Sequence, residues 1–186
     1  IGFSLGVPLG LWAAARRGSW ADEIIMRGND LIFAFPSLVI AILITAFFGA
    51  GAINAIIAIG IFNIPVFARV TRGGALSLWA REFILAARVS GKGAARISAE
   101  HILPNIAGVA LAYLMLTVPQ VVMVESFLSF LGLGVQEPLT SLGILVKEGA
   151  DDMDMTPLGL LLPGAVLVVL LVCLTVEGER LRDRFS

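Results

Sequence analysis

The chain has 186 residues, of which 58% are hydrophobic and only 15% are charged, and its mean hydropathy is +0.95. This apolar share is well above that of soluble domains, so the composition indicates a polytopic membrane protein. The formal net charge of −1 is not accompanied by a basic face, so nothing indicates a nucleic-acid partner. The single cysteine, Cys173, lies within an apolar run, which excludes a disulfide framework and a thiolate metal site.

Apolar and polar segments alternate through the first part of the chain. Residues 1–15 are apolar and predict the second half of a spanning helix whose beginning is missing, so we expect an N-terminally incomplete domain. Residues 18–30 are polar enough to predict a short interfacial helix. Residues 31–48 and 53–70 predict two complete spans joined by a tight turn, because about 20 apolar residues rising about 1.5 Å each cross a hydrocarbon core of roughly 30 Å.

The rest of the chain adds two more spans. Residues 72–105 form a polar, glycine-punctuated loop, and residues 106–124 predict the third complete span. Residues 125–156 are the longest segment without a continuous span, and residues 158–176 predict the last span before a charged tail. The sequence therefore predicts an all-α polytopic membrane protein with one partial and four complete spans, in a single domain of residues 1–186.

The basic residues predict the orientation of these spans. If the connections alternate sides, twelve of the thirteen Lys and Arg residues lie on one side of the membrane and only Lys147 lies on the other. Short loops rich in Lys and Arg stay in the cytoplasm. We therefore expect the loop of residues 72–105 to be cytoplasmic and the segment of residues 125–156 to be extracytoplasmic.

The cytoplasmic loop has a helical pattern in its second half. Its apolar residues Phe83, Ile84, Ala87 and Val89 recur at helical spacing, which predicts a helix of about two turns that ends at the glycines around Lys92. The pattern then predicts a second short helix from about Ala94 to His101, which Pro104 ends because proline does not continue a helix. Such a loop suits docking into a groove on a partner, and equally a solvated connector.

Four stretches of the chain resemble a known family. Leu85-Ala86-Ala87, then Gly91, then His101-Ile102-Leu103-Pro104-Asn105 resemble the EAA loop in the transmembrane subunits of binding-protein-dependent ABC importers. The motifs SFLGLGVQEP at 129–138, GERLRDRF at 178–185 and MRGNDLIFAFPSLVIAILI at 26–44 are similar to the dipeptide, oligopeptide and nickel permease branch. The resemblance covers essentially the whole chain in matching order.

This resemblance implies the transmembrane domain of a type I ABC importer in the cytoplasmic membrane of a prokaryote. The chain is then expected to be a permease subunit that moves di- or oligopeptides, or a related small solute such as nickel. It implies that the chain is no enzyme and holds no cofactor, since ATP and Mg²⁺ are bound by partner ATPase subunits. The other implied partners are a second permease subunit and an extracytoplasmic solute-binding protein.

The resemblance also implies which residues couple the chain to its ATPase. Residues 81–91 correspond to the coupling helix that sits in a cleft of the ATPase subunit, and we expect the coupling residues to be Arg81, Glu82, Leu85, Ala86, Ala87, Arg88, Gly91, Lys92 and Pro104. One position departs from the family, because Leu85 stands where the name-giving glutamate is expected. We therefore expect the contact to depend more on packing than on charge, with Glu82 as the nearest acidic substitute one turn earlier.

Chemistry within the chain itself is not expected. Gly91-Lys92-Gly93 fails the phosphate-loop pattern, because no glycine lies five residues before Gly91 and Gly93 replaces the Ser or Thr. His101 is the only histidine, so neither a metal site nor a Ser-His-Asp arrangement is expected. The alternative function is an ion-coupled secondary transporter or channel, which should carry charges at mid-membrane depth, whereas these spans carry charges only at their ends.

Four polar residues are candidates for a translocation path: Asn63, Gln120, Glu125 and Ser126. Polar groups at membrane depth usually face protein or a water-filled cavity. Asn63 and Gln120 serve equally well as interhelical hydrogen-bond partners, and Glu125 equally well as an interfacial residue. The acidic residues between positions 148 and 154 suit either a basic surface on a binding protein or a solvated loop.

Overall fold

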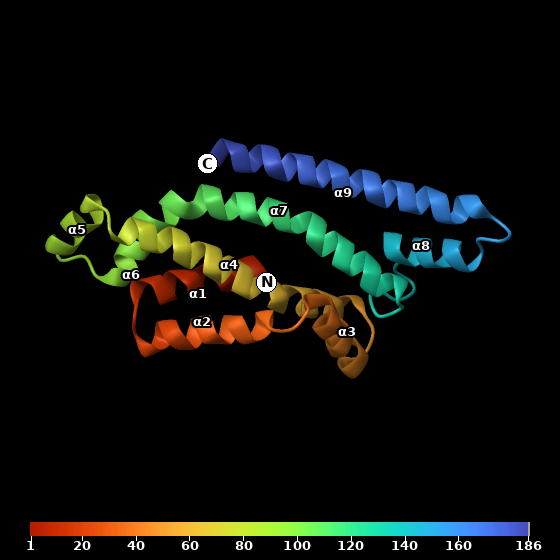
Figure 1. The fold of residues 1–186 in the computed structure, drawn as a ribbon, viewed down its shortest axis with the longest axis horizontal. Helices are drawn as coiled ribbons and strands as arrows, with labels where there is room; N and C mark the ends of the chain where they lie inside the picture. The colour runs from red at the N-terminus through yellow and green to blue at the C-terminus, as the bar shows by residue number, and fades with distance from the viewer. Residues whose placement is uncertain (186) are drawn as a thin grey trace. The chain divides into compact units, whose positions relative to one another are not determined.

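The computed structural model describes residues 1–185, and that part of the chain is helical without any strand (Figure 1). The predicted all-α class is confirmed. The elements in chain order are α1 (Gly2–Ala15), α2 (Trp20–Phe33), α3 (Ser37–Phe48), α4 (Ala52–Trp79), α5 (Glu82–Val89), α6 (Ala94–Ile97), the π-helical turn η1 (Ser98–Ile102), α7 (Leu103–Phe130), α8 (Leu142–Asp151) and α9 (Pro157–Phe185).

Three helices in the described residues are long and apolar enough to cross a membrane. They are α4, the continuous helix Ala94–Phe130 and Pro157–Arg184 of α9, and they contain the predicted spans 53–70, 106–124 and 158–176. The shorter apolar helix α1 covers the predicted partial span. The charged tail expected after the last span instead continues α9 as far as Phe185.

The first predicted complete span, residues 31–48, is wrong as one continuous helix. α2 ends at Phe33 and the apolar helix α3 begins only at Ser37, so residues 31–33 belong to α2 and not to the apolar helix. Pro36 stands at the N-cap of α3 with an extended ψ of 125°. Proline lacks an N–H and disfavours the helical conformation at the residue before it, which explains the break at Phe35.

The expectation that Pro104 ends the second loop helix is also wrong. α6, η1 and α7 form one continuous helix from Ala94 to Phe130, with Pro104 near the start of α7. The turn before Pro104 is π-helical, and the Leu103 N–H bonds to the Ser98 carbonyl five residues back. A widened turn of this kind relieves the crowding that a proline ring otherwise causes against the preceding turn.

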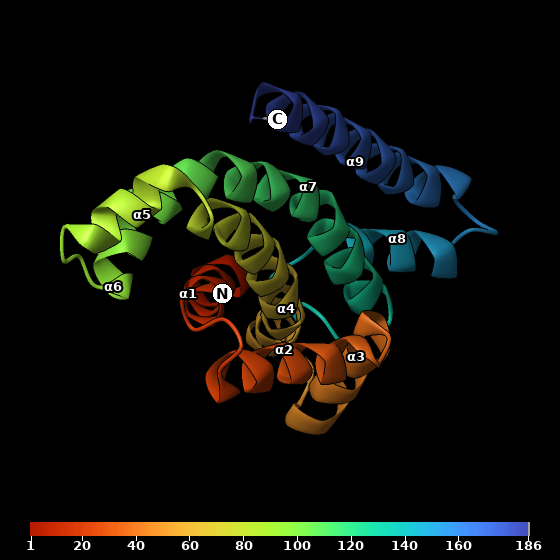
Figure 2. The same cartoon turned by 60° about the vertical axis from the view of Figure 1, so that its left-hand side comes forward.

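The residues form two compact units, and the first comprises Ile1–Phe35 and Ile61–Leu114. Within it, the glycines Gly2, Gly6 and Gly10 line one stripe of α1 and face α4 (Figure 2). A β-carbon at any of them would collide with Asn63, with the Ile64 carbonyl or with the Ala68 carbonyl of α4. Small residues spaced by four let two helix backbones approach closely in a membrane.

One buried cluster joins the loop helices of unit 1 to the longer helices. Ile84 and Ala87 of α5 pack with Ile97, Ile102 and Ile106 of the helix that begins at Ala94, and the same cluster includes Ala14 of α1 and Ala75 of α4. Each of these side chains is at most 9% exposed. The loop is therefore a packed part of the fold and not a solvated connector.

The second unit comprises Pro36–Gly60 and Met115–Arg184. Its core cluster brings together Ala41 of α3, Ala55, Ala58 and Ile59 of α4, and Leu128 of α7. The turn between α3 and α4 is closed by Asn54, whose side-chain amide donates to the Phe48 carbonyl at 3.1 Å and to the Gly49 carbonyl at 2.8 Å.

Candidate functional site

The helix α5 divides its side chains between a buried face and an exposed face. Ile84 and Ala87, three residues apart, are 0% and 9% exposed and belong to the core of unit 1. Leu85 and Val89, four residues apart, lie on the other side and are 50% and 90% exposed. Exposed apolar side chains grouped on one short helix outside the predicted spans make a candidate interaction surface. We call Leu85 and Val89, with the exposed Ala86 between them, the outer face of α5.

The sequence pattern placed α5 correctly but assigned two of its side chains to the wrong face. Phe83 and Val89 were grouped with Ile84 and Ala87 as the apolar side, yet Phe83 is 45% exposed and Val89 is almost fully exposed. The two adjacent alanines also lie on different faces of α5, since Ala86 is exposed and Ala87 is buried. A helix of only two turns offers too few positions for the pattern to locate the buried face.

The turn after α5 has the glycine-ended geometry expected from the sequence. Gly91 has a φ of +81°, a left-handed conformation that glycine adopts without a steric penalty. The Gly91 N–H bonds to the Arg88 carbonyl at 2.9 Å, and the Lys92 N–H bonds to the Ala87 carbonyl at 3.1 Å. This pair of bonds is the Schellman motif that ends many helices. It brings Lys92 back toward the following helix.

Two basic residues predicted to meet the ATPase are engaged by this chain. The Arg88 guanidinium lies over the Trp79 ring of α4, with 4.7 Å between its central carbon and the ring centroid. The Lys92 ammonium donates to the Glu100 carboxylate at 2.7 Å and lies 2.9 Å from Nε2 of His101. These contacts attach the C-terminal end of α5 to the two helices that flank it.

The other residues predicted to couple the chain to the ATPase are Arg81 and Glu82 at the start of α5 and Pro104 at the start of α7. Arg81 and Glu82, at the start of α5, line an open depression of about 590 Å³ together with Phe83 and the end of α4. Pro104 is exposed at the start of α7. The outer face of α5 and this depression both include residues of α5.

The four path candidates are distributed over both units. Asn63 lies in unit 1, where its β-carbon faces Gly2 of α1, which is the helix-packing position that the sequence left open. Gln120, Glu125 and Ser126 lie in unit 2 on α7, where Gln120 is exposed and Ser126 is 5% exposed. Glu125 is half-buried and accepts a hydrogen bond from the Ser129 hydroxyl at 2.7 Å. A path through these residues stays a prediction.

The glycine-rich motif after α7 folds back onto that helix. Gly134 lies directly against Ser129, whose hydroxyl accepts the Val135 N–H at 3.2 Å while donating to Glu125. At Gly132 the chain turns with a φ of +76°. Gly134 therefore permits the close approach of this segment to α7.

Replacing Gly134 by alanine is expected to lower the free energy of unfolding by about 1–3 kcal/mol, the usual cost of forcing extra volume into a packed site. The new β-carbon would meet the Ser129 hydroxyl and would lie 2.8 Å from the Ser129 backbone nitrogen, which cannot move aside. Thermal unfolding in detergent measures the loss. Gly73→Ala is the control, because that helical glycine has open space around it, and an equal loss in both variants would contradict the packing argument.

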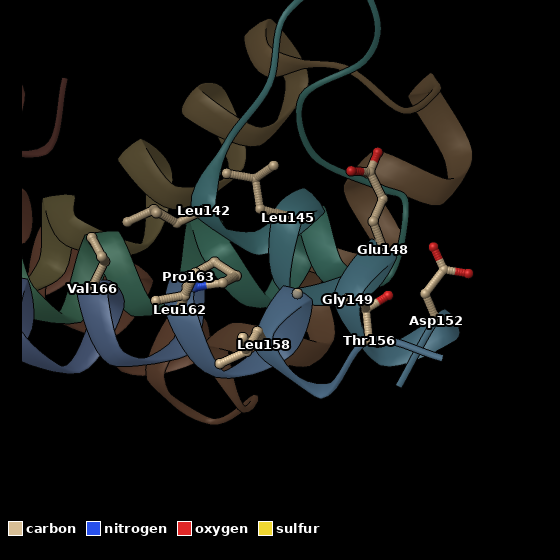
Figure 3. A pocket seen from close by; sticks show the side chains of 11 residues that line it. Leu142, Leu145, Glu148, Gly149, Asp152, Thr156, Leu158, Leu162, Pro163 and Val166 are labelled. Carbon is tan, nitrogen blue, oxygen red and sulfur yellow. The ribbon is translucent and has the colours of Figure 1, made fainter. Parts of the chain in front are cut away.

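An amphipathic groove lies between α8, in the segment expected outside the membrane, and the first turns of α9, in the last predicted span. Its volume is about 450 Å³, and leucines from both helices line it. Figure 3 shows the carboxylates of Glu148 and Asp152 at one end, away from Leu142 and Val166. The helices approach closely where Gly149 of α8 lies against the Gly159 backbone.

The family comparison covers almost all of this architecture. Residues 6–185 match the family described as the binding-protein-dependent transport system inner membrane component. The chain belongs to this family. That assignment confirms the resemblance seen in the loop and glycine motifs.

Relatives within the binding-protein-dependent transport family include peptide and glutathione permeases. The chain is 44% identical over 162 residues to the oligopeptide transport system permease protein OppC of Salmonella typhimurium, covering 87% of this chain and 54% of that protein. It is 36% identical to the glutathione transport system permease protein GsiD of Pectobacterium atrosepticum, covering 98% and 60%. It is 34% identical to the dipeptide transport system permease protein DppC of Lactococcus lactis, covering 98% and 53%. The chain spans about half the length of the curated relatives it matches.

A solved structure supports the same fold. The inward-facing MetNI methionine ABC transporter matches this family member with a TM-score of 0.76, covering 100% of this chain and 88% of the other at 18% identity. The predicted transmembrane fold of an ABC transporter is therefore confirmed.

Sequence reasoning missed three groups of residues that position the site. The Gly2, Gly6 and Gly10 stripe was detectable from its four-residue spacing. Val89 was detectable as a partner of Leu85 one turn earlier. The role of Glu100 as the partner of Lys92 had no sequence signal, because that contact depends on how the chain turns between them.

Proposed function

We propose that the protein is the transmembrane permease subunit of an ATP-driven importer in the inner membrane of a prokaryote. It works with a second permease subunit, two ATPase subunits that bind ATP and Mg²⁺, and an extracytoplasmic solute-binding protein. Short peptides are the proposed cargo, with a related small solute such as nickel as the alternative. The names of the peptide permeases among its relatives support this substrate class.

The main observation behind this proposal is the exposed outer face of α5. Leu85 and Val89 are exposed apolar residues on a helix whose other side is locked into the core. Docking of this face in an ATPase cleft covers the apolar surface and leaves the buried face in place. The family match over residues 6–185 supports this role over that of an ion-coupled secondary transporter or channel.

The packing of α5 suggests how ATPase motion reaches the membrane helices. Ile84 and Ala87 share one close-packed cluster with Ala75 of α4 and Ile106 of α7. Interiors of this density transmit displacement, since a buried side chain cannot move without its neighbours. When the ATPase dimer closes on ATP, the pressure on α5 therefore acts on both flanking helices.

Reconstitution tests this function directly. Proteoliposomes that hold the full-length protein with its second permease and ATPase should take up a labelled peptide only with ATP and the binding protein present. Ionophores that collapse proton and sodium gradients should leave that uptake unchanged. Gradient-driven uptake without the ATPase would overturn the proposal, and competition by Ni²⁺ but not by peptides would replace the substrate class alone.

A further inference from the structure

The side chain of Lys92 joins the end of α5 to the first turns of the next spanning helix. We propose that Lys92 is a positioning residue whose contacts with Glu100 and His101 tie the coupling helix to the π-helical turn η1. Displacement of α5 is thereby passed to α7. This inference rests on the proposed function and assigns Lys92 a role inside the chain in place of a contact with the ATPase.

The geometry of the contact is specific. The Lys92 ammonium lies 2.7 Å from Oε2 of Glu100 and 2.9 Å from Nε2 of His101, so two of its three donors are used on neighbouring residues of one turn. An ammonium group only donates, so Nε2 of His101 is the acceptor. The other Glu100 oxygen accepts from Nε of Arg96 at 2.6 Å. Glu100 is thus held from both sides, but only Lys92 connects it to α5.

The turn that receives these contacts is the irregular part of the helix. η1 spans Ser98–Ile102, and the Leu103 N–H bonds five residues back in place of four. Pro104 follows directly and contributes no N–H to the helical ladder. Single π-helical turns within an α-helix often mark functional positions. A push delivered here acts at the turn where the hydrogen-bond pattern departs from that of the regular helix.

The contact contributes little to folding, which makes its role testable. The side chains of Lys92 and Glu100 are 30% and 38% exposed. Ion pairs with this much solvent contact add little net stability. Removing the Lys92 ammonium therefore leaves the buried cluster of Ile84, Ile97 and Ile102 and the outer face of α5 intact.

The experiment compares Lys92→Met with Arg96→Met in the reconstituted complex. Each variant removes one basic partner of Glu100, but only Lys92→Met removes the polar link between the end of α5 and η1, because Arg96 lies on the same continuous helix as Glu100. We expect Lys92→Met to retain ATPase co-purification and ATP hydrolysis while solute transported per ATP hydrolysed falls about fivefold or more. Arg96→Met and Lys92→Arg should keep that ratio near the wild-type value. The Lys92→Met and Glu100→Gln double variant should be no worse than Lys92→Met alone, as for residues acting through one contact.

Three outcomes would overturn the inference. The ratio of transport to ATP hydrolysis could stay unchanged in Lys92→Met, or fall equally in Arg96→Met. Loss of ATPase co-purification in Lys92→Met would make Lys92 a docking contact instead. The wild-type complex separates this inference from the proposed function. If the proposed function is wrong, the wild-type complex shows no ATP-driven uptake at all.

Discussion

Replacing Leu85 and Val89 together by aspartate is expected to release the ATPase subunits while the protein still inserts into the membrane. Both side chains are exposed in the folded chain, so the change disturbs no buried contact. Each apolar side chain covered by a partner contributes about 1.5–3 kcal/mol. Because Leu85 is already half covered within the chain, the double change should weaken ATPase association about 30-fold or more. Co-purification of the ATPase with the tagged protein from solubilised membranes measures the loss.

A matched control places the same added charge elsewhere on the loop. Ala94 and Ala95 are exposed at the start of α6, where aspartate is compatible with a helix N-terminus, so their double replacement should leave the ATPase bound. The single variant Leu85→Glu tests whether the ATPase contact at this position depends on packing or on charge, since the resemblance implies a glutamate here in the family. If Leu85→Glu kept or strengthened the coupling, an apolar contact at Leu85 would not be needed.

Replacing Arg72 by methionine is expected to lower the free energy of unfolding by about 3–5 kcal/mol, the usual cost of breaking a buried ion pair. Arg72 of α4 binds Asp22 of α2 through two hydrogen bonds of 2.7 and 2.8 Å. The Asp22 side chain is only 6% exposed, so the variant leaves its carboxylate buried without its arginine partner. Unfolding of the purified protein in detergent, followed by circular dichroism, measures the effect.

The neighbouring pair between the same two helices serves as the control. Arg69 binds Asp30 at 2.7 Å, but these side chains are 55% and 66% exposed, so Arg69→Met should cost no more than about 1 kcal/mol. Combining Arg72→Met with Asp22→Asn should recover part of the lost stability, because no buried charge then remains. Equal losses for the two arginine variants would show that burial does not decide the contribution of these pairs.

The spans around residues 53–70, 106–124 and 158–176 were predictable because each is a local property of the chain. A long apolar run in a membrane must satisfy its backbone groups internally, and a helix is the only structure that does so within one segment. The glycine-ended turn at Gly91 was predictable for a similar reason, since its left-handed φ favours glycine.

The two proline positions show where such reasoning stops. Pro36 breaks the apolar run of residues 31–48, whereas Pro104 lies within a continuous helix. Both residues lack the same N–H, so residue type alone does not separate them. At Pro104 the preceding π-helical turn accommodates the ring, whereas at Pro36 one helix has ended and the next begins.

The sequence by itself determined the membrane class, three of the four complete spans, the position of the short helix α5 and the family. Each follows from residues close together in the chain or from motifs in a matching order. Only the tertiary structure decided that Leu85 and Val89 form the free face of α5, and that Arg88 and Lys92 bind within the chain. The physical reason is that exposure and ion pairing depend on which distant residues pack against a helix, and a two-turn helix carries too few positions to encode its own orientation.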